Sequence, residues 1–149
     1  MAVNPVPDGY HSVTPYLCIN GAAGAIEFYQ RAFGAEELFR FPMPDGSIGH
    51  AEIQIGDTRI SLADDHPEGG LLSPQGSSSV GLLLYVEDVD SVFARAVEAG
   101  ATVRRPLKDQ FYGDRMGTLE DPFGHVWFLA THIEDVPEDE LQKRAAELS

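Results

Sequence analysis

Hydrophobic residues recur every three to four positions between residues 21 and 34, and the run ends at Gly34. This spacing predicts an amphipathic helix, because residues three and four apart share one helix face. The segment before it, 13–20, has the apolar character of a strand. Three shorter stretches after the helix are also strand-like: Glu37–Phe41, Gly49–Ile55 and Thr58–Ala63. The first half therefore predicts the order strand, helix and three strands.

The same order of patterns returns after a stretch rich in Gly, Pro and Ser, residues 65–78. The expected elements of this second half are a strand at 80–86, a helix at 89–100, and strands at 102–105, 111–119 and 126–130. An internal repeat of this kind predicts two βαβββ modules, at about 13–64 and 79–131, with 65–78 as their linker. Because one module alone leaves a sheet face uncovered, we expect two tandem modules that pair around a shared cavity.

The two ends of the chain differ from this repeat. Residues 1–12 are rich in Pro and predict a flexible lead, and residues 13–136 then form a single domain. Residues 137–149 predict a short acidic tail helix, because Pro137 and three acids at its start suit the first turn of a helix.

Charge excludes some classes of partner. The 149 residues include 24 acidic and 10 basic residues, for a formal charge of −14. Proteins that bind phosphate backbones or anionic lipids need clustered Lys and Arg, so neither nucleic acid nor a membrane is an expected partner. The chain has no signal-like start and no long apolar run, which predicts a cytoplasmic protein. Its single cysteine, Cys18, cannot form an internal disulfide and is interpreted as a buried hydrophobic residue.

Polar side chains alternate with apolar ones along the strand predicted at 49–55. His50, Glu52 and Gln54 share one face of that strand, because side chains alternate with a period of two. His50 and Glu52 could form an acid/base pair, bind a cationic group, or belong to a relocated metal site with Asp64 or His132. The alternative is that this face is the solvated outer face of an edge strand.

A second polar group lies in the Gly-flanked segment that contains Tyr112, Asp114 and Arg115. Asp114 and Arg115 could pair with each other. Alternatively, Arg115 could bind a carboxylate or phosphonate, because its planar guanidinium suits two-pronged recognition of anions. The segment 121–124, Asp-Pro-Phe-Gly, predicts a tight structural turn before the last strand. Several aromatic residues are expected to fill the core or a cavity wall: Phe39, Phe41, Phe111, Trp127 and Phe128.

Several motifs resemble the vicinal-oxygen-chelate superfamily, which includes glyoxalase I, bleomycin-resistance proteins, fosfomycin-resistance proteins and extradiol dioxygenases. They include Pro15-Tyr16-Leu17, Val86-Glu87-Asp88-Val89-Asp90, Tyr112-Gly113-Asp114-Arg115-Met116-Gly117 and Asp121-Pro122-Phe123-Gly124-His125-Val126-Trp127. The closing run through residues 130–135 is most similar to the PhnB-like branch. The resemblance implies an α+β fold in which tandem βαβββ modules form a curled mixed sheet around a cavity, and commonly a homodimer.

The resemblance also implies a divalent metal held by four side chains, one each from the first, fourth, fifth and eighth strands. The first, fifth and eighth of these positions fall on Thr14, Gly81 and Phe128, and the fourth-strand position lies near Ala63 or Asp64. Neither Gly nor Phe offers a donor atom in its side chain. We therefore expect no metal at the usual site and no cofactor, and the resemblance does not support glyoxalase or dioxygenase activity.

The expected function is that of a glyoxalase/bleomycin-resistance-like protein, which binds a small molecule in the cavity of a homodimer as antibiotic-resistance proteins do. The alternative is a lyase or oxygenase-type enzyme of the same superfamily, with a displaced metal or an acid/base site at His50 and Glu52. The residues expected to contact the ligand are His50, Glu52, Gln54, Tyr112, Arg115 and Phe128.

Overall fold

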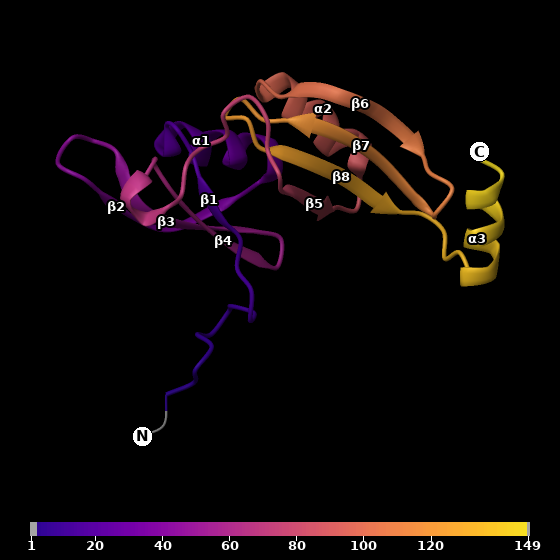
Figure 1. Ribbon diagram of the computed structural model, residues 1–149, viewed down its shortest axis with the longest axis horizontal. Helices are drawn as coiled ribbons and strands as arrows, with labels where there is room; N and C mark the ends of the chain where they lie inside the picture. The colour runs from indigo at the N-terminus through magenta and orange to yellow at the C-terminus, as the bar shows by residue number, and fades with distance from the viewer. Residues whose placement is uncertain (1–2, 149) are drawn as a thin grey trace. The chain divides into compact units, whose positions relative to one another are not determined.

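The computed structural model describes residues 3–148, which divide into two compact units with the boundary between residues 77 and 78 (Figure 1). Each unit contains one four-stranded mixed sheet. The repeated βαβββ order and the α+β class predicted from the sequence are confirmed. Among the described residues, no helix has the length and apolar character needed to cross a membrane.

The described part of the first unit contains one α-helix and four strands. Their bounds are β1 Tyr16–Cys18, α1 Ala22–Phe33, β2 Glu36–Pro42, β3 Ile48–Ile55 and β4 Thr58–Ala63. The strand order in the sheet is β1-β4-β3-β2, with β1 parallel to β4 and the other neighbours antiparallel. Because β3 is paired on both sides, it is an inner strand, which corrects the alternative of an edge strand.

Helix α1 forms where the hydrophobic spacing predicts it. Its buried residues include Ala22, Ile26 and Tyr29, all fully buried, and they lie on one face of the helix. The helix packs against β3, whose residues are alternately buried and half-buried. It ends at Gly34, whose φ of 69° is left-handed and costs little without a Cβ. The buried face of α1 and the buried face of β3 therefore pack together into one core.

The second unit repeats this arrangement and adds a final helix. Its elements are β5 Gly81–Tyr85, α2 Val89–Ala99, β6 Thr102–Asp109, β7 Asp114–Glu120, β8 Val126–His132 and α3 Glu138–Ala146. The strand order is β5-β8-β7-β6, the same as in the first unit. Strand β6 runs four residues beyond the predicted end at Arg105, with irregular register against β7. Pro106, which lacks a backbone N–H, conceals this extension in the sequence.

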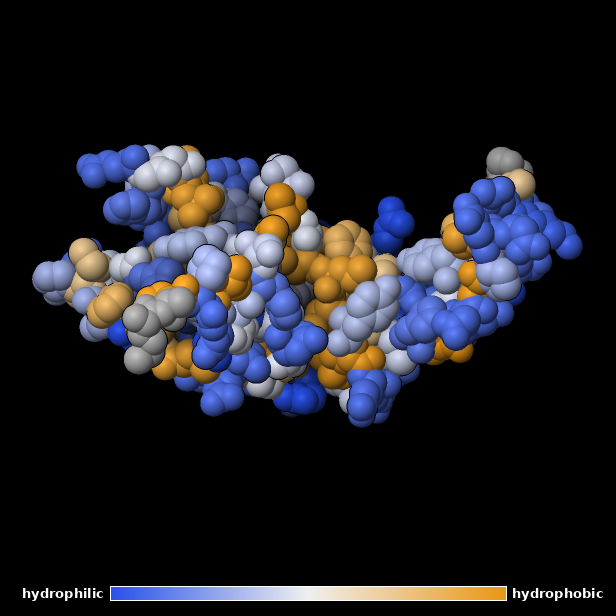
Figure 2. Space-filling model, turned by 90° about the horizontal axis from the view of Figure 1, so that it is seen from below, coloured by the Kyte–Doolittle hydropathy of each residue, from blue (hydrophilic) through white to orange (hydrophobic). Residues whose placement is uncertain are grey.

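The expected tail helix is present as α3, with three acids in its first turn and no buried residue. Figure 2 shows that this end of the chain is largely hydrophilic. The guanidinium of Arg144 fixes the helix, because it donates hydrogen bonds to the Phe111 carbonyl and to both oxygens of Glu134, each at 3.0 Å. Arg144 thus connects the tail helix to residues that precede β7 and follow β8.

The segment expected to be a linker packs on the first unit instead. It contains a short 3-10 helix, Pro67–Gly69, and a bridge between His66 and Leu71. Ser73 is buried, and the thiol of Cys18 in β1 lies 3.3 Å from the Asp65 carboxylate and 3.5 Å from the Leu71 carbonyl oxygen. Gly, Pro and Ser indicate turns in a sequence, but they do not reveal whether the turns pack on a neighbouring sheet.

At the other end of the first unit, Tyr10 lies in the segment expected to be a flexible lead. The guanidinium of Arg59 lies 4.9 Å from the centre of the Tyr10 ring. A turn closed by the Tyr10 N–H and the Pro7 carbonyl precedes this contact. The last residues of the lead therefore contact the first unit.

Candidate functional site

One face of the first sheet lies away from α1, and we call it the first open face. Side chains alternate along a strand, so the half-buried residues of β3 lie on the face opposite its buried residues. Register pairs Glu52 with both Phe39 and Ser61, and Ser61 with Tyr16. The first open face therefore carries Tyr16, Phe39, Phe41, His50, Glu52 and Ser61.

Three of these side chains form a chain of hydrogen bonds. The Tyr16 hydroxyl lies 2.9 Å from His50 Nδ1, and His50 Nε2 lies 3.0 Å from a carboxylate oxygen of Glu52. An ionised carboxylate only accepts hydrogen bonds, so Nε2 carries the proton towards Glu52. In the neutral imidazole Nδ1 is then the acceptor, and the Tyr16 hydroxyl donates to it. The predicted pair of His50 and Glu52 thus extends to a third residue, Tyr16.

Aromatic rings surround this chain. The centre of the His50 ring lies 5.4 Å from that of Tyr16 and 5.7 Å from that of Phe39, and Phe39 and Phe41 are 5.3 Å apart. Phe41 is 63% exposed and Tyr16 is 45% exposed. Exposed aromatic rings beside a polar group suit an organic ligand, which can stack on the rings and form directed hydrogen bonds. Gln54 lies further along β3, where its amide donates to the Gly56 carbonyl.

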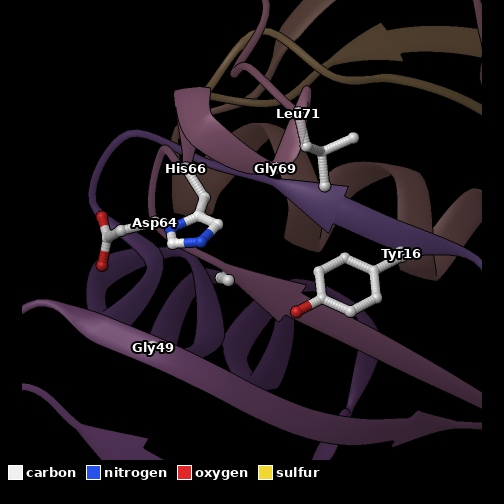
Figure 3. A pocket seen from close by; sticks show the side chains of 7 residues that line it. Tyr16, Gly49, Asp64, His66, Gly69 and Leu71 are labelled. Atoms are coloured by element: carbon white, nitrogen blue, oxygen red, sulfur yellow. The ribbon is translucent and has the colours of Figure 1, made fainter.

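A pocket of about 220 Å³ opens beside Tyr16 (Figure 3). The start of β1, the end of β4 and the loop around His66 line it. Figure 3 shows the Tyr16 hydroxyl and the His66 imidazole pointing into the same space. A Cβ added to Gly69 would come within 2.9 Å of the His66 ring, so a larger residue there would displace the imidazole.

Asp64 has a structural position in this unit. One carboxylate oxygen accepts from the backbone N–H groups of Gly21 and Ala22, at 2.8 and 3.1 Å, and the other accepts from Ile48 at 2.7 Å. The first two bonds cap the N-terminus of α1, where unpaired N–H groups favour an anion. This bonding argues against the relocated metal site proposed for Asp64, because three backbone donors already occupy its oxygens.

The corresponding face of the second sheet lies away from α2, and we call it the second open face. Gly117 contacts Phe93 of α2, so alternate residues of β7, including Asp114 and Met116, lie on the other side. Pairing of β7 with β8 adds Phe128 and His132 to this face, and β5 adds Leu83 and Tyr85. The Tyr112 hydroxyl reaches it through a 3.2 Å contact to the Met116 sulfur.

Asp114 forms the centre of a polar group on the second open face. Its carboxylate accepts from the Tyr85 hydroxyl at 2.7 Å and bonds to His132 Nδ1 at 2.8 Å. The other ring nitrogen of His132 lies 2.7 Å from Asp135. Hydrogen bonds to Asp114 and then Asp135 raise the pKa of His132 above its usual value, and the bond to Asp114 raises the pKa of Tyr85. His132 is therefore held by carboxylates of its own unit rather than by the His50 site.

Arg115 lies on the helix side of the second sheet. Its guanidinium bonds both oxygens of Asp90, at 2.9 and 3.0 Å, and one oxygen of Asp109 at 3.0 Å. Of the two alternatives left open for Arg115, pairing with Asp114 is wrong, because adjacent strand residues point to opposite faces. The same alternation separates Arg115 from Phe128, and we leave Arg115 out of the proposed binding surface.

The positions implied for a metal do not offer a ligand set. In the second unit, a Cβ on Gly81 would come within 2.5 Å of the Phe128 ring, so the ring fills the space that a side chain at Gly81 would need. Neither residue has a donor atom in its side chain. Within the described part of the chain, His, Cys, Asp and Glu side chains do not gather in groups of three that could hold a metal ion.

The repeat corrects the fourth-strand position. The Ile19 N–H donates to the Ala63 carbonyl as the Val86 N–H donates to the Ala130 carbonyl, which makes Ala63 equivalent to Ala130. Two residues earlier on each strand, Ser61 is then equivalent to Phe128. Ser61 is buried, and Thr14 lies two residues before β1 begins. Neutral hydroxyls at both positions are poor substitutes for the imidazole and carboxylate ligands of Zn²⁺ or Fe²⁺.

Sequence reasoning missed Tyr16 and His66. Tyr16 stands in an apolar run that predicts a strand, and His66 stands in a Gly- and Pro-rich loop. One signal is available for Tyr16, since tyrosine combines an apolar ring with a polar hydroxyl and is enriched at interfaces. The pairing of β1 with β4 and the fold of the loop, which bring these residues to one pocket, are not visible in sequence spacing.

Comparisons with known proteins agree with this architecture. The sequence model of the glyoxalase/bleomycin resistance protein/dioxygenase superfamily matches residues 10–129. An uncharacterized protein of Mycobacterium tuberculosis is 44% identical over 147 residues, which cover 95% of this chain and 84% of the relative. Among solved structures, TioX from Micromonospora sp. ML1 has a TM-score of 0.66 and 28% identity, with 83% of this chain and 99% of TioX covered. A PhnB protein from Bacillus cereus has a TM-score of 0.65 at 19% identity, covering 81% and 99%, which supports the fold alone.

Proposed function

We propose that this chain, which belongs to the glyoxalase/bleomycin resistance protein/dioxygenase superfamily, binds a small organic molecule without the usual divalent metal. The observation that carries the proposal is the contact between Phe128 and Gly81. Two of the four positions implied for the metal are thereby closed to any donor. A protein of this superfamily that lacks the Lewis acid can still bind a ligand, because the ligand is held by rings and hydrogen bonds.

The first open face is the proposed binding surface. Tyr16, Phe39 and Phe41 supply aromatic contact area, and His50 and Glu52 supply directed polar groups. The first unit holds ten acidic and three basic residues, and Arg40 is paired with Glu37. This excess of acids favours a neutral or cationic ligand over an anion. On the second open face, Phe128 and Tyr112 remain proposed ligand contacts.

A thermal-shift experiment tests both parts of the proposal. Zn²⁺, Ni²⁺, Mn²⁺ and Fe²⁺ are each added to the protein, and in parallel 9-aminoacridine, a flat cationic aromatic compound. A ligand that binds only the folded state raises the melting temperature of the protein by mass action. We expect a shift with the aromatic compound and none with the metals. A stoichiometric metal that raises the melting temperature would contradict the metal-free assignment.

Two variants locate the binding. Phe41→Ser removes the most exposed ring of the first open face and should weaken binding of 9-aminoacridine about tenfold, the loss of one stacked ring of roughly 1–1.5 kcal/mol. Val6→Ser removes a partly exposed apolar side chain in the lead and should leave binding unchanged. Equal affinities in the two variants would place the ligand elsewhere.

A homodimer is part of the same proposal. The superfamily often forms dimers, and several apolar side chains of the chain are exposed, among them Leu72, Val80 and Leu83. Light scattering after size-exclusion chromatography gives the mass directly. A mass of about twice 16.2 kDa supports a dimer, and a mass of 16.2 kDa at micromolar concentration contradicts it.

The hydrogen-bond chain of Tyr16, His50 and Glu52 favours one second candidate, an enzyme of the same superfamily with an acid/base site at His50 and Glu52. Tyr16, His50 and Glu52 are connected by hydrogen bonds of 2.9 and 3.0 Å, along which a proton can move. A strand face that only contacts solvent would not require such a connected chain. Asp64 and His132 are engaged elsewhere, and among the described residues no group of three possible ligands includes His50 and Glu52, so a displaced metal is not part of this candidate. A metal-induced thermal shift that His50→Ala abolishes would contradict this.

A further inference from the structure

We propose that Tyr16 is the proton-transferring group of this protein, and that His50 and Glu52 position and activate it. The assignment deepens the second candidate function and depends on it rather than on ligand binding alone. The reacting atom is the Tyr16 hydroxyl oxygen, at the end of the hydrogen-bond chain, and Tyr16 lines the pocket.

The direction of the hydrogen bonds is the first observation that supports this assignment. Glu52 is 19% exposed and bonds His50 Nε2, which fixes the ring proton on that nitrogen. Nδ1 is then a free base, 2.9 Å from the phenol oxygen. A proton moved from Tyr16 to Nδ1 leaves a phenolate and an imidazolium, and the imidazolium is stabilised by the Glu52 carboxylate. The same logic activates a hydroxyl wherever a base is oriented by a carboxylate.

The second observation is that a ligand in the pocket can reach Tyr16 more readily than His50. Tyr16 is 45% exposed and lines the pocket, whereas the His50 ring is packed between Tyr16 and Phe39. A small molecule in the pocket would therefore meet the phenol oxygen before it met the imidazole. The pocket is small, about 220 Å³, and Leu71 and Ala63 form part of its apolar wall.

The His66 imidazole suggests the class of substrate. It points into the same space as the Tyr16 hydroxyl (Figure 3) and can donate a hydrogen bond. A small neutral carbonyl compound fits these groups, with its oxygen towards His66 and its neighbouring C–H towards Tyr16. The phenolate takes the proton from carbon, the electron pair forms an enolate, and return of the proton to carbon completes the exchange. No other reactant is consumed in this proton transfer.

Tyr85 provides a matched comparison within the same chain. It is 53% exposed, close to the exposure of Tyr16, and its hydroxyl also donates one strong hydrogen bond, at 2.7 Å to Asp114. An ionised carboxylate accepts this bond, and it raises the pKa of Tyr85, so the phenol keeps its proton. Two tyrosines of similar exposure thus differ in whether their partner can take the proton.

Labelling with phenylmethanesulfonyl fluoride tests the activation without any substrate. A tyrosine oxygen displaces fluoride and forms an oxygen–sulfur bond, and the phenol proton leaves through the base. Peptide mapping by mass spectrometry then gives a rate for each tyrosine. We expect Tyr16 to react at least tenfold faster than Tyr85, and His50→Gln to remove most of that difference, because a positioned base contributes typically 10²–10⁴-fold.

Equal rates for Tyr16 and Tyr85, or a Tyr16 rate unchanged in His50→Gln, would overturn the assignment. Glu52→Gln should lower the Tyr16 rate and leave the Tyr85 rate as it was. Binding of 9-aminoacridine is measured on the same proteins, so that a failure of activation is distinguished from a failure of the binding proposal. Circular dichroism establishes that the variants are folded.

The substrate class is tested with hydroxyacetone in deuterated water. Exchange of its C–H protons next to the carbonyl is followed by NMR. Wild-type protein should accelerate this exchange, and Tyr16→Phe should abolish the acceleration, while Tyr85→Phe should retain it. Equal exchange with wild type and Tyr16→Phe would overturn the carbonyl assignment.

Discussion

The aromatic ring of Phe128 lies against the backbone of Gly81. These two residues stand at neighbouring strands of the second sheet, at positions where the superfamily resemblance implies metal ligands. The small residue and the large one are complementary, since a Cβ at Gly81 would approach Phe128 Cε2 to 2.5 Å. Gly81 and Phe128 therefore both lack a metal-binding side chain, and the Phe128 ring occupies the space that a side chain at Gly81 would need.

This complementarity predicts coupled effects on stability. Gly81→Ala should lower the free energy of unfolding by about 1–3 kcal/mol, because the added methyl overpacks the contact with Phe128. The same substitution in a Phe128→Ala background should cost much less. Urea unfolding of both single variants and the double variant gives the coupling energy. Additive effects would show that the ring can move aside freely.

Asp64 is expected to stabilise the protein and not to bind metal. Asp64→Ala removes the acceptor of three backbone N–H groups and should cost about 2–4 kcal/mol. Asp64→Asn retains one oxygen and should fall between Ala and wild type. Thermal unfolding with and without Zn²⁺ measures the series. A stability loss that appears in the presence of metal alone would contradict the capping role.

Asp121 is the buried carboxylate of the turn before β8. One oxygen accepts from the backbone N–H groups of Phe123 and His125, and the other accepts from the Trp127 indole at 3.0 Å. Asp121→Asn places an amide donor against the indole N–H and should cost about 2–3 kcal/mol. In a Trp127→Phe background the same change should cost less. Circular dichroism during urea unfolding measures both, and equal costs would exclude the indole contact as the cause.

His132 should make stability depend on pH. Its pKa in the folded protein is raised by Asp114 and Asp135, so its contribution is complete below the unfolded value of about 6.5. The contribution disappears as pH rises through the folded pKa. The difference in urea midpoint between wild type and His132→Gln should therefore shrink from pH 6 to about pH 9. His11→Gln, in the exposed lead, is the matched control. A constant difference across this range would contradict the ion pair.

The sequence predicted the elements well where a period was unbroken. The helix that ends at Gly34 and the strand Thr58–Ala63 were predicted almost to the residue, because hydrophobic spacing and turn residues agree there. The prediction ends β6 at Arg105, since Pro106 follows it and the register against β7 is irregular there. The packing of 65–78 on the first unit is not predicted either, because it depends on distant contacts such as that of Cys18 with Leu71.

For the candidate site, alternation along one strand correctly grouped His50 with Glu52. It also separates Asp114 from Arg115, which excludes the ion pair between them that the sequence left open. Asp64 could not be assigned from sequence, because its partners lie 16 and 42 to 43 positions away. Distant partners of this kind are chosen by strand pairing rather than by local spacing.

By itself, the sequence determined the repeated βαβββ order, the acidic charge and the lack of donors at Gly81 and Phe128, since each of these depends on residue type and local period. The tertiary structure alone decided that Phe128 fills the space over Gly81, that Asp64 caps a helix, and that Tyr16 completes a chain with His50 and Glu52. The physical reason is that pairing of β1 with β4, and of β5 with β8, brings together side chains that no sequence spacing connects.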